Sequence, residues 1–226
     1  GAIAHKHVAA VNGLENGEIV GAYDVNQEAG QVFSKKYAIP VFSDVDKLVE
    51  ATRPDVFNIL TPSGFHAENI LDLIRFNKHF VVEKPLALDL ESVDQILEAC
   101  HAGGLKVFVV KQNRFNPPIV KLKEAIDSGR FGKLVLGTVR IRWCRTQEYY
   151  DSKPWRGTRS IDGGGFANQA LHHIDMLAWM MGDVSRIMAM SSAQLVNIEA
   201  EDTGAAIFHF NNGALGIIEA TMASRP

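Results

Sequence analysis

Apolar and polar residues alternate along the first 110 or so positions in two kinds of segment. Short apolar runs bounded by turn residues predict buried strands, and longer stretches with apolar residues three and four apart predict helices. The predicted strands lie at 18–24, 38–42, 56–60, 80–82 and 106–110, and the predicted helices at 1–11, 26–37, 44–50, 66–76 and 90–102. Strands that alternate with helices indicate βαβ units, so this half is predicted to be a doubly wound parallel sheet.

The pattern changes after about residue 116. A helix is predicted at 117–128, and strands at 134–143, 185–194, 202–210 and 214–220. The sequence Asn-Asn-Gly at 211–213 is a strong hairpin signal, so this half is predicted to be an α+β domain with an open, mostly antiparallel sheet. We place the domain boundary between residues 115 and 116. Because the chain opens in a helix and stops among strands, we expect a fragment that lacks both ends, including the first strand.

Composition narrows the function classes. The 226 residues carry a net charge of −3 with scattered basic residues, which argues against nucleic-acid or anionic-membrane partners. No apolar run approaches the roughly 20 residues of a membrane span. Cys100 and Cys144 lie far apart and match no metal-ligand spacing, so we expect reduced thiols, no metal site and a cytoplasmic protein.

Several residues of the first half have the spacing of a dinucleotide site. In such folds an acid about 20 residues after the glycine loop binds the ribose 2′-hydroxyl, and Asp24 has this position. A carboxylate there would repel the 2′-phosphate of NADP, which favours NAD. Gly1, Ile3 and Ala4 fit the end of the glycine loop. The turn after the strand at 56–60 adds further candidate cofactor contacts, although turn chemistry and helix capping alone would also explain them: Thr61, Pro62, Ser63 and His66.

Two segments carry candidate catalytic chemistry. Lys84 lies just past the strand at 80–82, and ligands of parallel sheets bind outside the carboxyl ends of strands. The alternative is a charged pair in a solvated turn. Asn168, His172 and Asp175 are spaced i, i+4 and i+7 in a helix predicted at 166–182, after three glycines that allow close approach of backbone or ligand. Histidine is the natural general base near neutral pH, and an ordinary solvated helix face is the alternative.

The segments 83–85 and 165–175 resemble the signatures of the glucose-fructose/inositol dehydrogenase/rhizopine-catabolism (Gfo/Idh/MocA) superfamily of NAD(P)-dependent sugar oxidoreductases. The resemblance covers essentially the whole chain. Within the family it is most similar to UDP-N-acetyl-2-amino-2-deoxyglucuronate 3-dehydrogenases, on segments 112–117, 149–150, 155–158 and 168–169. It implies a Rossmann-type NAD-binding domain, a substrate domain, and homo-oligomers, dimers or tetramers, that associate through the C-terminal sheet.

The resemblance also implies a reaction. It is NAD-dependent oxidation of the C3 hydroxyl of a UDP-N-acetylglucosaminuronate-type nucleotide sugar, in the synthesis of bacterial cell-surface polysaccharide sugars. His172 would be the general base, Lys84 would stabilise developing charge or share the proton relay, and Asn168 would fix the geometry. Many relatives have Asp at position 168, and an amide cannot take up a proton.

The remaining candidates follow from the same resemblance. Glu83 and Gln112 are candidate cofactor contacts. The candidate substrate contacts are polar and aromatic: Arg114, Asn116, Arg145, Tyr149, Tyr150, Trp155, Arg156, Thr158, Gln169 and His173. Two alternatives stay open, namely a dehydrogenase of a free polyol or monosaccharide and a non-catalytic relative that senses a sugar or NAD.

Overall fold

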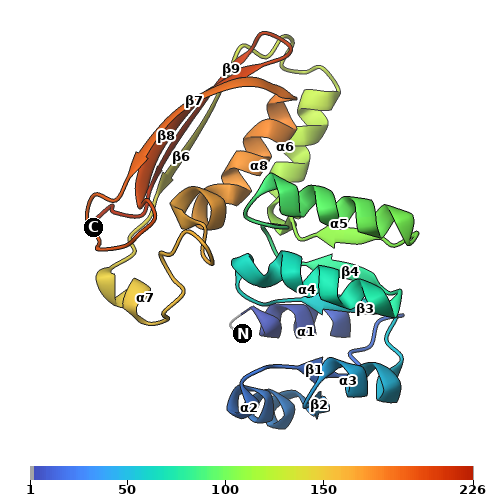
Figure 1. Ribbon diagram of the computed structural model, residues 1–226. Coiled ribbons are helices and arrows are strands. Elements are labelled where there is room, and N and C mark those ends of the chain that lie inside the picture. Colours follow the sequence, from blue (N-terminus) through green and yellow to red (C-terminus); the bar gives the residue numbers. More distant parts are fainter. Residues whose placement is uncertain (1–2, 226) are drawn as a thin grey trace. The chain divides into compact units, whose positions relative to one another are not determined.

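The computed structural model describes residues 3–225 and divides the chain into two units (Figure 1). Unit 1 comprises Gly1–Thr61, His66–Glu83 and Asp94–Phe108, and unit 2 comprises Pro62–Phe65, Lys84–Val93 and Val109–Pro226. The sequence predicted one boundary between residues 115 and 116. In the structure the chain also passes into unit 2 at the turns that follow two strands of unit 1, so Lys84 belongs to unit 2 and Glu83 to unit 1.

Unit 1 contains short parallel sheets flanked by helices. Its elements are α1 (Ala4–Asn12), β1 (Ala22–Tyr23), α2 (Gln27–Tyr37), β2 (Val41–Phe42), α3 (Val45–Thr52), β3 (Val56–Ile59), α4 (His66–Leu73), η2 (Ile74–Phe76), β4 (His79–Val82), most of α5 (Leu90–Ala102), and β5 (Val107–Val109). Strand β1 pairs with β2 in parallel, β3 pairs with β4 in parallel, and β3-β4-β5 form one sheet. These pairings agree with the predicted parallel sheet.

The core of unit 1 explains why these elements form. Alternate residues of β3 and β4 are buried, including Phe57, Phe80 and Val82, and Ile70 of α4 and Ile96 of α5 are fully buried as well. Short polar side chains cap the starts of α2 and α3. Asn26 accepts a hydrogen bond from the backbone N–H of Ala29 at the start of α2 (2.9 Å), as expected for an N-cap.

Unit 2 is built on one four-stranded sheet. Its elements are η1 (Ser63–Phe65), η3 (Gln112–Phe115), α6 (Pro117–Asp127), β6 (Leu136–Arg142), α7 (Gln147–Asp151), η4 (Gly165–Ala170), α8 (Leu171–Met181), β7 (Val184–Ser192), β8 (Thr203–Phe210) and β9 (Leu215–Thr221). The strand order is β6-β9-β8-β7. β8 is antiparallel to both its neighbours and β6 is parallel to β9, so the predicted mostly antiparallel sheet is confirmed.

One face of this sheet packs against α8, as Figure 1 shows. Leu177 and Met181 of α8 belong to one buried cluster with Phe208 and Ile218 of the sheet. Gly137 of β6 permits this close packing, because a Cβ there would lie 2.8 Å from Leu177 Cδ1. Burial of this apolar surface holds α8, and with it the side chains that it carries, at a fixed place on the sheet.

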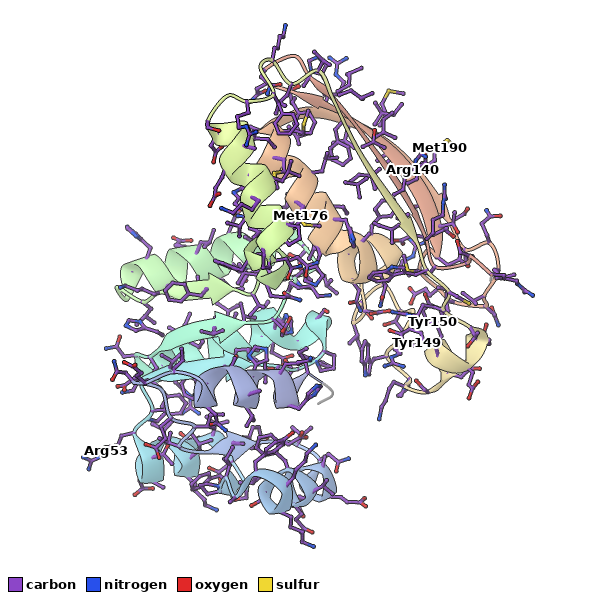
Figure 2. The ribbon with its side chains drawn as sticks, turned by 180° about the vertical axis from the view of Figure 1, so that it is seen from behind. Arg53, Arg140, Tyr149, Tyr150, Met176 and Met190 are labelled. Atoms are coloured by element: carbon purple, nitrogen blue, oxygen red, sulfur yellow. The ribbon has the colours of Figure 1, made fainter. Side chains whose placement is uncertain are left out.

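The other face of the sheet is open. Met188, Met190 and Ile207 are 70%, 84% and 52% exposed. Figure 2 labels Met190 and Arg140 on this face. Within residues 3–225, no helix is long and apolar enough to cross a membrane.

Candidate active site

Lys84 lies two residues after β4, at the carboxyl end of that strand, and contacts the glycine-preceded helix of unit 2. Its Nζ donates to the backbone oxygen of Asn168 (2.7 Å) and to Asn168 Oδ1 (2.9 Å), and both residues are half-buried. The two predicted catalytic segments, 84 residues apart along the chain, therefore meet.

Asn168 belongs to a π-helical turn, η4, rather than to the α-helix that the sequence predicted from residue 166. The N–H of Gly165 donates to the backbone oxygen of Glu201 (3.0 Å), and the N–H of Phe166 donates to Glu201 Oε1 (2.9 Å). These bonds satisfy N–H groups that a helix start leaves without intrahelical partners. Single π-helical turns are frequent at functional sites. The predicted regular i, i+4, i+7 stripe is therefore wrong in its first turn.

Asp162 is a member of this cluster that the sequence analysis missed. Its carboxylate is 4% exposed, accepts from the N–H of Gly157 (2.7 Å), and accepts from Asn168 Nδ2. An acid directly before three glycines was the available signal, but the same pattern is common in ordinary loops.

His172 and Asp175 lie on α8 and contact the segment at 111–114. His172 Nε2 is 3.3 Å from Gln112 Nε2. Asp175 accepts from Arg114 Nε and Nη2 (2.7 Å each), and Lys111 Nζ lies 3.4 Å away. Burial raises the pKa of Asp175, but the Arg114 hydrogen bonds and the Lys111 charge outweigh it and hold the pKa below its usual range.

Arg114, a predicted substrate contact, is paired with Asp175 in the structure. Two of its guanidinium nitrogens are occupied by Asp175, and its Cζ lies 4.9 Å from the centre of the Trp179 ring. This bidentate pair holds α8 to the preceding segment.

A second group of predicted substrate contacts does come together around Tyr149, which Figure 2 labels on the short helix α7. The guanidinium carbons of Arg145 and Arg156 lie 4.9 and 4.1 Å from the centre of its ring. Gln169 donates to the Tyr149 hydroxyl (3.1 Å) and accepts from Arg145 Nη2 (3.5 Å). In the described part of the chain, the buried Nε atoms of both arginines lack a hydrogen-bond partner. Trp155 lies beside Arg156, 5.6 Å from ring centre to Cζ.

Tyr150 and His173 pack against other aromatic rings of unit 2. Tyr150 is 5% exposed, and burial, aided by nearby acidic groups, raises its pKa to about 12. His173 packs edge-on against Trp143 (5.9 Å between ring centres), and burial lowers its pKa. Both rings therefore stay neutral near pH 7 inside unit 2.

Thr158 serves local structure, whereas Asn116 is exposed. The Thr158 hydroxyl donates to the backbone oxygen of Trp155 (2.7 Å) and accepts from the N–H of Ile161 (3.3 Å), which closes the turn. Asn116 is exposed at the start of α6, and its side chain makes no capping hydrogen bond.

The cofactor candidates of unit 1 lie at strand ends and at the start of α1. Asp24 directly follows β1, and its Oδ1 accepts from the N–H of Asn26 (2.9 Å). Ile3 and Ala4 stand at the start of α1, where helix N–H groups favour anions. Gly1 lies outside the described residues.

Other cofactor candidates are engaged within the protein. Glu83 Oε1 is 2.9 Å from His7 Nε2, and His7 Nδ1 is 3.0 Å from Asn58 Nδ2. His66 is 1% exposed and its Nε2 contacts the backbone oxygen of Thr61 (2.9 Å), so it braces this turn.

The Thr61 turn continues into unit 2. Thr61 donates its hydroxyl to Asn69 Oδ1 (2.8 Å) and remains exposed. Pro62 and Ser63 follow in unit 2, where Ser63 is 8% exposed, which disfavours ligand contact by its side chain. Among residues 3–225, no cluster of three or more His, Cys, Asp or Glu side chains could hold a metal ion.

Comparison with known proteins gives this geometry a context. Residues 1–111 match an oxidoreductase family with an NAD-binding Rossmann fold, and residues 119–226 match the Gfo/Idh/MocA C-terminal domain. The WlbA dehydrogenase of Bordetella pertussis, solved with NADH and UDP-GlcNAcA, is 38% identical with a TM-score of 0.96, over 100% of this chain and 69% of that one. The chain belongs to the Gfo/Idh/MocA family of oxidoreductases. The predicted family, fold class and NAD cofactor are thereby confirmed.

Two further relatives are a second WlbA dehydrogenase and an inositol dehydrogenase. The WlbA dehydrogenase of Chromobacterium violaceum, also solved with NADH and UDP-GlcNAcA, is 33% identical with a TM-score of 0.96, over 100% of this chain and 66% of that one. Myo-inositol 2-dehydrogenase of Thermotoga maritima is 24% identical over 97% of this chain and 65% of its own length. The chain thus spans slightly under two thirds of the length of this curated relative.

Proposed function

We propose that this protein oxidises the C3 hydroxyl of a UDP-N-acetylglucosaminuronate-type nucleotide sugar with NAD as hydride acceptor, in the synthesis of bacterial cell-surface polysaccharide sugars. The observation that carries the proposal is the contact of Lys84 with Asn168, four residues before His172. It holds the Lys84 ammonium against η4, the turn that directly precedes the start of α8, where His172 lies.

Unit 1 supplies the residues for the dinucleotide. Asp24 at the end of β1 would bind a ribose hydroxyl, and the start of α1 would face the pyrophosphate. The bound dinucleotide supplies the hydride acceptor. An acid at the ribose position favours a free 2′-hydroxyl over a 2′-phosphate.

The residues of unit 2 handle the proton. As hydride leaves the C3 carbon, the hydroxyl proton passes to the imidazole of His172, which is a base of suitable strength near neutral pH. The Lys84 ammonium stabilises the negative charge that develops on the same oxygen. Asn168 fixes the ammonium through two acceptor oxygens and takes up no proton itself.

The group around Tyr149 favours a nucleotide sugar over a free polyol. Arg145 and Arg156 bring two cations to one aromatic ring, and such arginines suit the carboxylate and pyrophosphate of the substrate. The two WlbA structures were solved with UDP-GlcNAcA, whereas similarity to inositol dehydrogenases keeps a free polyol as the alternative substrate.

Absorbance of NADH at 340 nm tests the proposal. We expect turnover of UDP-GlcNAcA with NAD, and a much lower kcat/KM for free myo-inositol and glucose. His172→Ala is expected to lower kcat by about 10²–10⁴-fold, the usual contribution of a positioned base. Lys84→Ala should lower kcat by a similar factor, while NADH binding, followed by its fluorescence, persists.

The matched controls are His101→Ala and Lys133→Ala, both at exposed positions. They should leave kcat and KM unchanged. Near wild-type turnover by His172→Ala or Lys84→Ala with bound cofactor would refute the catalytic assignment. Equal activity on myo-inositol would favour the polyol alternative, and NADH binding without turnover of any sugar would favour a sensor.

We also propose that the open face of the unit 2 sheet binds a second copy of the chain. Met188, Met190 and Ile207 expose apolar surface there, next to Arg142, which pairs with Glu219 (2.6 Å). A face that carries apolar rows and both signs of charge can match its own copy about a two-fold axis. Met190→Glu should lower the mass measured by light scattering after size exclusion. Val25→Glu, at 83% exposure in unit 1, is the control, and an unchanged mass for Met190→Glu would exclude this face.

A further inference from the structure

Three side chains of unit 2 form a continuous chain from a buried carboxylate to the site lysine. Asp162 accepts from Asn168 Nδ2, and Asn168 Oδ1 accepts from Lys84 Nζ (2.9 Å). We propose that Asp162 is a positioning residue for Lys84, acting through the amide of Asn168. This inference rests on the proposed function, because it assigns the orientation and charge balance of the lysine that the reaction uses.

The chemistry of the three groups permits one orientation of the amide. A lysine ammonium only donates hydrogen bonds, and an ionised carboxylate only accepts them. The amide must therefore turn its oxygen to Lys84 and its NH₂ group to Asp162. If the amide of Asn168 were flipped, its NH₂ group would face the Lys84 ammonium and its oxygen would face the Asp162 carboxylate, and neither pair could form a hydrogen bond. The pair of charges thus holds the amide, and the amide holds the ammonium.

Asp162 is well held itself. It is 4% exposed, and Gly157 donates its N–H to Asp162 Oδ2 at 2.7 Å. Its own N–H donates to the backbone oxygen of Thr158 (3.2 Å). A buried carboxylate needs such donors and a nearby cation. The turn at 157–162 therefore presents a fixed negative charge to the amide, and Lys84 is the cation at the other end.

The arrangement changes the meaning of an asparagine at position 168. From the sequence, the amide was interpreted as a loss of carboxylate assistance. In the structure, the carboxylate stands one hydrogen bond further from the lysine, at Asp162. Asn168→Asp alone would bring two carboxylates into contact, and like charges at that distance disfavour joint ionisation. A simultaneous exchange, with Asn at 162 and Asp at 168, would restore one amide and one carboxylate.

The experiment is a side-chain exchange. Asp162→Asn and Asn168→Asp are each expected to lower kcat on the UDP-sugar by about 10–100-fold, the scale of a 1 Å misplacement in a site. KM should change less than about 3-fold, since on this proposal Asp162 touches no substrate. The double variant is expected to recover at least about 10-fold in kcat over the worse single variant. Asp183→Asn, at an exposed carboxylate of the same unit, is the control and should match the wild type.

A second readout separates this inference from the proposed function. Trace acetylation of lysine amines with acetic anhydride, quantified by peptide mass spectrometry, reports the reactivity of Lys84 relative to exposed Lys133. Asp162→Asn and Asn168→Ala should each raise the relative labelling of Lys84 by at least about 3-fold. This holds even if wild-type protein turns over no sugar, in which case the proposed function fails and the positioning role stands.

The outcomes decide clearly. If Asp162→Asn does not fold by circular dichroism, Asn168→Ala carries the test, because it breaks the same connection at a half-buried position. Unchanged labelling of Lys84 in Asn168→Ala overturns the proposal. So does a folded exchange variant that is no more active than either single variant, because a purely structural role predicts additive losses.

Discussion

The ion pair between Asp175 and Arg114 gives the sharpest test of the forces that hold α8. Asp175 has a side-chain exposure of 12% and Arg114 of 34%. Asp175→Asn keeps the shape of the side chain, removes the charge, and replaces one acceptor oxygen by a donor that faces the guanidinium. Lys111, 3.4 Å from the carboxylate, loses its partner as well.

The expected cost follows from burial. A hydrogen bond to a charged group contributes roughly 1.5–3 kcal/mol, and breaking a fully buried pair costs about 3–5 kcal/mol. Solvent screens the half-exposed arginine, so a value below that range applies. We expect Asp175→Asn to lower the free energy of unfolding by about 1–2 kcal/mol at pH 7.

The cost should depend on pH in a defined direction. Burial acts to raise the pKa of Asp175, but Arg114 and Lys111 together hold it below its usual range. A group with a lowered folded pKa stabilises the protein above its unfolded pKa of about 3.9, and this contribution is lost as the pH falls through the folded pKa. The difference in free energy of unfolding between the wild type and Asp175→Asn should therefore become smaller below about pH 4.

Urea unfolding followed by tryptophan fluorescence measures the effect. The chain has three tryptophans, and all of them (Trp143, Trp155 and Trp179) lie in unit 2, so the signal reports that unit. Glu124→Gln is the control, because Glu124 is 58% exposed and its pair with Lys121 should contribute less than about 0.5 kcal/mol. If Asp175→Asn costs no more than the control at pH 7, or costs the same at pH 3.5, the reasoning is refuted.

Two further predictions concern the same unit. Gly164→Ala should lower the free energy of unfolding by about 2–4 kcal/mol, because φ is +96° and a Cβ would lie 2.5 Å from Glu201 Oε2. The control is Gly129→Ala, which has φ +73° and open space and should lower it by about 1 kcal/mol. Equal losses for the two variants would contradict the clash. Burial, aided by nearby acidic groups, raises the pKa of Tyr150 to about 12. In an alkaline absorbance titration, one of the four tyrosines should therefore ionise near pH 12, and Tyr150→Phe should remove that step. If Tyr150→Phe instead removes a step near pH 10, the prediction is refuted.

Local patterns predicted some element bounds closely and others poorly. The predicted helix at 90–102 has the bounds of α5, because a regular apolar stripe and the glycines after it determine both ends locally. The predicted strand at 18–24 shrinks to Ala22–Tyr23. Strand length depends on the partner, and β2 offers only Val41 and Phe42 for pairing. This limit is set by another part of the chain, so it cannot be predicted from the sequence of the strand itself.

The candidate site shows the same division between local and distant information. Strand-end and helix arguments located Lys84 and His172, because both depend on neighbouring residues. The pairing of Arg114 depends on Asp175, which is 61 residues away along the chain. The sequence alone therefore does not distinguish an arginine in an ion pair from one that binds an anionic ligand. Burial of Asp162 depends likewise on the fold of its loop, and an acid beside glycines otherwise indicates a solvated turn.

The glycine run before Asn168 is explained by close protein contacts and, at Gly163 and Gly164, by positive φ angles of +84° and +96°. A Cβ on Gly163 would lie 2.6 Å from Leu88, and one on Gly164 would lie 2.5 Å from the Glu201 carboxylate. A Cβ on Gly165 would lie 3.0 Å from the backbone oxygen of Glu201. The sequence left open whether these glycines admit backbone or ligand, and each is needed for close packing. Because Glu201 then also receives the first N–H groups of η4, the glycines set where the π-helical turn starts, and so where Asn168 meets Lys84.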